Sequence, residues 1–78
     1  MPTERGIMMR LKDPIAIQQT LIGMGYITVG EMHAKLGMSY NTFSKALAGK
    51  PVQPRTIKKF ATGLGLKMLD VGEFVENS

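Results

Sequence analysis

The chain has 78 residues, a net charge of +4 and no cysteine. We expect a single domain at residues 13–78, because this length leaves no room for separate binding and regulatory domains. The absence of cysteine excludes disulfide bonds, thiolate catalysis and cysteine-ligated zinc. No apolar run approaches the length of a membrane span and the polar start is no signal peptide, so we expect a cytoplasmic protein.

Positive charge is concentrated in the middle of the chain, where no acidic residue occurs between Glu31 and Asp70. The basic residues of this segment are Lys35, Lys45, Lys50, Arg55, Lys58, Lys59 and Lys67. A segment with this much positive charge commonly binds the phosphate backbone of nucleic acids. A surface that only promotes solubility is the alternative interpretation.

The first predicted elements are an arm and a helix. Residues 1–12 have no clear helical period, and we expect them to form a flexible N-terminal arm. Asp13 followed by Pro14 is typical of a helix start, because Asp caps exposed amides and Pro tolerates the first helical position. Apolar residues then recur at helical spacing until Gly25, which can adopt the left-handed conformation that ends a helix.

Two short helices separated by a turn of about three residues are predicted next. Thr28 and Glu31 have the spacing of a capping box, in which each side chain binds the other residue's amide at a helix start. This helix should end at Gly37. Ser39 then caps a third helix, from Tyr40 to Ala48, which is closed by Gly49.

The rest of the chain also predicts helices. A proline-containing loop at residues 50–54 leads to a helix from about Arg55 to Leu64, which Gly65 ends. A short fifth helix is expected near residues 70–76, and no alternating pattern indicates a strand. The sequence therefore predicts an all-α fold, a five-helix bundle.

The segment from residue 28 to residue 49 carries the clearest resemblance to a known family. Residues 32–50, MHAKLGMSYNTFSKALAGK, resemble the Cro/repressor-type helix-turn-helix family of phage and bacterial regulators, and residues 54–66 are similar to that family's following helix. The resemblance implies a lambda-repressor-like fold. It also implies a transcription regulator, of a phage switch between lysis and lysogeny, that binds operator DNA and can form a homodimer.

The helix that begins at Tyr40 would be the reading helix, because burial of Phe43 and Leu47 turns its opposite face outward. Amide and ammonium side chains on that face suit the base edges of the major groove. The residues that we expect to bind DNA or a partner are Ser39, Tyr40, Asn41, Thr42, Ser44, Lys45 and Ala48. The expected phosphate contacts are Thr28, Lys50, Arg55 and Thr56.

Two residues depart from the family pattern. The family usually has a small residue at the position of His33, because the two helices come close there. Val29 stands where many members have a polar side chain that holds a phosphate. The second hypothesis is therefore an antirepressor, similar to the modulators of repression of temperate phages, which would bind a phage repressor's DNA-binding domain through the same surface.

No set of residues predicts an enzyme. A nucleophile would need a histidine oriented by a carboxylate, and the one histidine, His33, lies on a helix without acidic neighbours on its face. We therefore expect a binding protein without catalytic residues, metal site or cofactor.

Overall fold

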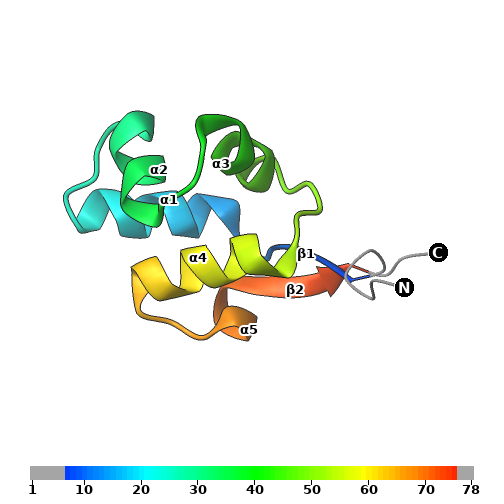
Figure 1. Ribbon diagram of the computed structural model, residues 1–78. Coiled ribbons are helices and arrows are strands. Elements are labelled where there is room, and N and C mark those ends of the chain that lie inside the picture. The colour runs from blue at the N-terminus through cyan, green and yellow to red at the C-terminus, as the bar shows by residue number, and fades with distance from the viewer. Residues whose placement is uncertain (1–6, 76–78) are drawn as a thin grey trace.

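Five helices and a two-stranded antiparallel sheet make up the fold that a computed structural model gives for residues 7–75 (Figure 1). The elements in chain order are β1 (Met8–Leu11), α1 (Pro14–Gly23), α2 (Val29–Leu36), α3 (Tyr40–Leu47), α4 (Pro54–Leu64), α5 (Met68–Val71) and β2 (Gly72–Val75). In Figure 1, α2 and α3 lie at the top, α4 crosses below them, and β2 and α5 lie at the bottom. None of the helices in this part of the chain has the length and hydrophobicity that a bilayer span requires.

The sheet shows that the prediction of an all-α fold is wrong. β1 pairs antiparallel with β2, with Met9 opposite Phe74 and Leu11 opposite Gly72. Met9 and Leu11 are buried, so residues 8–11 belong to the folded domain and are no flexible arm. Residues 1–6 of the predicted arm lie outside the described residues. Each strand has only four residues and pairs with a strand at the other end of the chain, so no local sequence pattern predicts the pairing.

The fifth helix is also shorter than predicted, because the chain becomes extended at Gly72. A Cβ atom at Gly72 would lie 2.8 Å from Ile57 Cγ2 and 3.1 Å from the main-chain oxygen of Arg10. The strand therefore packs closely against both α4 and β1 at this point. Beside it, Arg10 Nε and Glu73 Oε2 form an exposed ion pair at 2.8 Å.

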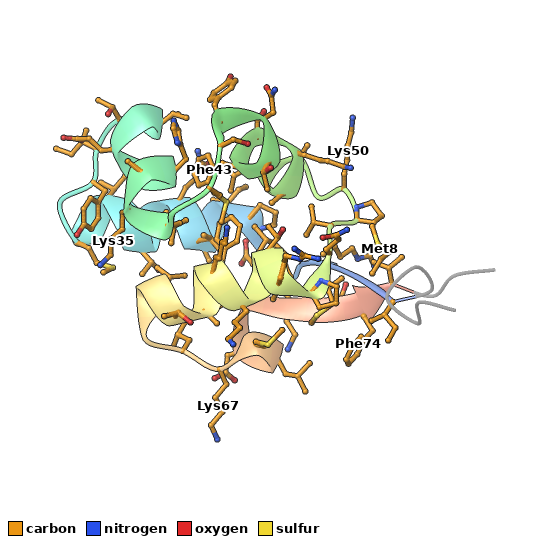
Figure 2. All side chains as sticks on the ribbon, in the orientation of Figure 1. Met8, Lys35, Phe43, Lys50, Lys67 and Phe74 are labelled. Carbon is orange, nitrogen blue, oxygen red and sulfur yellow. The ribbon has the colours of Figure 1, made fainter. Side chains whose placement is uncertain are left out.

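The core lies between the helices and the sheet, and every element except β2 contributes a buried apolar side chain. Phe43 of α3 stacks on Phe60 of α4 with 5.9 Å between ring centroids. Both rings are fully buried, and Figure 2 shows Phe43 among the helices, beside α2 and α3. Ala46 completes the buried face of α3, whereas Leu47, expected inside, is half-buried.

The four longer helices end as their glycines predict. At the end of α2, the Gly37 N–H donates to Ala34 and the Met38 N–H donates to His33 across five residues, which is a Schellman motif. The same pair of bonds closes α1, α3 and α4. The glycines with positive φ at these ends are Gly25, Gly37, Gly49 and Gly65.

Candidate nucleic-acid interface

The two helices of the predicted motif, α2 and α3, are joined by a tight turn. Gly37 adopts φ 72° and ψ 35°, which reverses the chain without strain because glycine has no Cβ. Met38 follows and is buried under the turn. The turn therefore has a side chain anchored in the core on one side and a Schellman motif on the other, which fixes the angle between the helices.

The first turns of both helices are capped by side chains. Thr28 Oγ1 accepts from the Glu31 amide at 3.1 Å, while Glu31 Oε1 accepts from the amides of Thr28 and Ile27. The backbone N–H groups of Thr28 and Ile27 hold the pKa of Glu31 below its ordinary value. Ser39 Oγ accepts from the Thr42 amide at 3.2 Å and donates to Thr42 Oγ1 at 3.0 Å. Both predicted caps, at Thr28 and at Ser39, are confirmed.

His33 is half-buried at the junction of α2, the turn and α3. Its Nδ1 lies 2.9 Å from the main-chain oxygen of Met38, and its ring lies edge-on to Tyr40 with 6.2 Å between centroids. The ring also lies 6.4 Å from that of Phe43. The larger side chain is thus accommodated by pointing along the turn, where it binds a carbonyl group and two aromatic rings.

The outward face of α3 carries the predicted reading residues. Tyr40 is 57% exposed, and the other exposed members of the face are Asn41, Ser44, Lys45 and Ala48. Thr42 is half-buried, and its hydroxyl is engaged with Ser39. The structure therefore brings five of the seven predicted residues to one open surface and uses Ser39 and Thr42 to hold the start of the helix.

The predicted phosphate contacts are not all on the open surface. Lys50 is exposed in the loop after α3 and points away from the molecule in Figure 2. Thr28 and Arg55 are exposed at the starts of α2 and α4. Thr56 is different: it is only 8% exposed, and it lines a groove between α4 and the turn. The predicted phosphate contact of Thr56 stays a prediction, and the residue lines this groove instead of the open surface of α3.

Lys59 is a residue whose role the sequence did not predict. Its Nζ donates to the main-chain oxygen of Gly37 at 3.1 Å, which connects α4 with the turn of the motif. The residues are twenty-two positions apart, and a lysine that follows another lysine on a helix gives no local signal of such a contact.

Lys67 carries its charge to the opposite side of the molecule from Lys50 (Figure 2).

Among residues 7–75, no group of three histidine, cysteine, aspartate or glutamate side chains could hold a metal ion. Comparisons of the chain with protein-family models, with curated proteins and with solved structures gave no match.

Proposed function

We propose that the chain is a helix-turn-helix transcription regulator that binds operator DNA by placing α3 in the major groove. The observation that carries the proposal is the exposed face of α3, together with the common edge of the molecule at which α2 and α3 begin (Figure 1). A helix of this kind fits the major groove, which is about 12 Å wide. Both helix starts would then point toward the DNA, as in helix-turn-helix proteins.

The side chains of α3 divide into two roles in this proposal. Asn41 can donate to and accept from adenine, and Lys45 can donate to guanine. Lys50 and Arg55 flank the helix at positions from which they can neutralise phosphates. Such a regulator acts in the bacterial cytoplasm, where its operator lies, and a two-fold operator would be read by a homodimer.

The test compares specific and random duplex DNA by mobility shift. Asn41→Ala and Lys45→Ala should each reduce the preference for the operator, with a cost of about 1 to 3 kcal/mol for a lost base contact. Gln19→Ala is the matched control, because Gln19 is exposed on α1. Equal losses on operator and on random DNA would contradict a reading role for α3.

The second candidate function is that of an antirepressor, in which the same surface binds a phage repressor's DNA-binding domain. Three exposed apolar side chains at the starts of α2 and α3 favour it: Ile27 at 69%, Val29 at 39% and Tyr40 at 57% exposure. The Glu31 carboxylate lies at the start of α2. Its negative charge repels a phosphate at that position. Exposed apolar and aromatic side chains suit a protein partner better than a phosphate backbone.

A titration into a repressor–operator complex separates the two candidates. The antirepressor releases the repressor or joins its complex, and Tyr40→Ala abolishes this effect. Phe74→Ala is the control, because Phe74 is exposed on β2, away from the motif (Figure 2). Tight binding to operator alone, without any effect on bound repressor, favours the DNA-binding regulator.

A further inference from the structure

A groove of about 600 Å³ opens between the turn of the motif and the first turns of α4. Its polar lining residues include Ser39, Thr42, Gln53, Arg55, Thr56 and Lys59, and no acidic side chain lines it. The volume is within the range of small-ligand sites, about 300 to 1,000 Å³. The groove therefore combines hydroxyl groups and two cationic side chains in a space large enough for a ligand.

Thr56 is the feature of the groove that points to a ligand. It is more than nine-tenths buried, and it is the one polar residue that is buried in the described part of the chain. Its hydroxyl has no hydrogen bond to any residue of the range 7–75. No polar side-chain atom that is fully buried lacks a partner there, so this unbonded hydroxyl keeps some contact with solvent, and Thr56 lines the groove. The Thr56 hydroxyl is thus available as a hydrogen-bond donor at the wall of the groove.

The other groups around Thr56 favour an anion. α4 starts at the groove without a side-chain cap, and the Thr56 N–H donates to the main-chain oxygen of Gln53 at 2.9 Å, so the helix dipole adds positive potential there without a free amide. Lys59 is held over the turn by its bond to Gly37. Thr42 Oγ1 accepts the Ser39 proton and keeps its own proton to donate.

We propose that this groove is a binding site for a phosphoryl group, which receives hydrogen bonds from Thr56 and Thr42 and is neutralised by Arg55 and Lys59. Hydroxyl donors on two different elements suit the separated oxygens of a tetrahedral anion. The group can come from a free phosphate compound or from a DNA backbone. Only the second source rests on the proposed function, because the groove itself does not need α3 to read DNA.

Occupancy of the groove would also act on the motif. Lys59 and His33 line the groove and both bind main-chain oxygens of the turn, at Gly37 and Met38. An anion that attracts Lys59 competes with the Gly37 oxygen for its protons. Binding of an anion in the groove therefore weakens a hydrogen bond to the turn, and this turn sets the angle between α2 and α3.

The test is a titration of the full chain with inorganic phosphate, followed by the amide signals in NMR at constant ionic strength. Saturable shifts should centre on Ser39, Thr42 and Thr56. Thr56→Val removes the hydroxyl at nearly constant shape and should weaken phosphate binding about tenfold, since a hydrogen bond to a charged group is lost. Thr56→Ser should restore binding, and Thr62→Val, an exposed threonine on the same helix, should leave it unchanged.

Two results would overturn the site: wild-type affinity in Thr56→Val, or unsaturable shifts spread over all lysine-rich surfaces. A second titration, with random duplex DNA, identifies the source. If the groove binds the DNA backbone, phosphate and duplex DNA compete for it, and Thr56→Val weakens the binding of duplex DNA. If the groove binds a free phosphate compound, phosphate and duplex DNA bind at the same time. If the wild type binds no DNA at all, the proposed function fails, while the phosphate titration still decides the site.

Discussion

His33 Nδ1 lies 2.9 Å from the main-chain oxygen of Met38, and this contact fastens the last turns of α2 to the start of α3. A carbonyl oxygen can only accept, so Nδ1 carries the proton and the ring's orientation is fixed. His33 thus contributes to the rigidity of the connection between α2 and α3. The contact also places an aromatic ring beside Tyr40, the first residue of α3.

Replacement of His33 should therefore destabilise the domain. His33→Ala removes one hydrogen bond and two ring contacts, and we expect a loss of about 1 to 2 kcal/mol in the free energy of unfolding. Urea unfolding followed by circular dichroism measures this loss, with Gln19→Ala as the exposed control. A variant as stable as that control would mean that the imidazole contact contributes nothing.

Phe43→Ala should unfold much of the population at ambient temperature. The substitution removes a fully buried ring that stacks on Phe60, which costs about 3 to 5 kcal/mol, comparable with the whole stability of many small domains. Phe74→Ala, at a ring that is 65% exposed, should change the melting temperature little. If both variants melt alike, the stacked pair is not the centre of the core.

The capping box should make the stability of α2 dependent on pH. The pKa of Glu31 is lowered in the folded state by the amides of Thr28 and Ile27, so the ionised carboxylate stabilises the fold above its unfolded pKa. That contribution is lost as pH falls through the lowered folded value, below the ordinary glutamate pKa of about 4.3. Glu31→Gln should therefore lose less stability on acidification than the wild type, as thermal melts over a pH series would reveal. Parallel curves for the two proteins would rule out this contribution.

Removal of residues 1–12 tests whether the N-terminal strand is part of the domain. The truncation deletes Met9 and Leu11 from the core, the pairing with β2 and the two backbone bonds between Met9 and Val52. We expect an unfolded or strongly destabilised protein, seen as a collapse of amide dispersion in NMR. Removal of residues 1–6 alone is the comparison. A truncated chain with the spectrum of the full chain would show that the strand is dispensable.

Lys50 should contribute to DNA affinity but not to sequence preference. Each neutralised phosphate steepens the fall of log affinity with log salt by about 0.9, so Lys50→Ala should reduce the slope by about one. Fluorescence anisotropy over a salt series measures the slope on operator and on random DNA. A change of preference between these two DNAs would instead assign Lys50 to base reading.

The helical part of the candidate site follows from short-range features of the sequence. Thr28 with Glu31, Ser39 and the four terminal glycines act on atoms within five residues, so their effect on α2 and α3 is local and readable from spacing. The alternation of buried and exposed positions then placed Tyr40, Asn41 and Lys45 on the outer face of α3.

Other features depend on residues far apart in the chain and became visible only in the folded protein. The pairing of Met9 with Phe74 joins the two ends, and a four-residue strand carries too little periodicity to predict it. The contact between Lys59 and Gly37, and the burial of Thr56 beside the turn, depend on how α4 crosses the motif. Their free energy comes from packing and long-range hydrogen bonds, which local spacing does not encode.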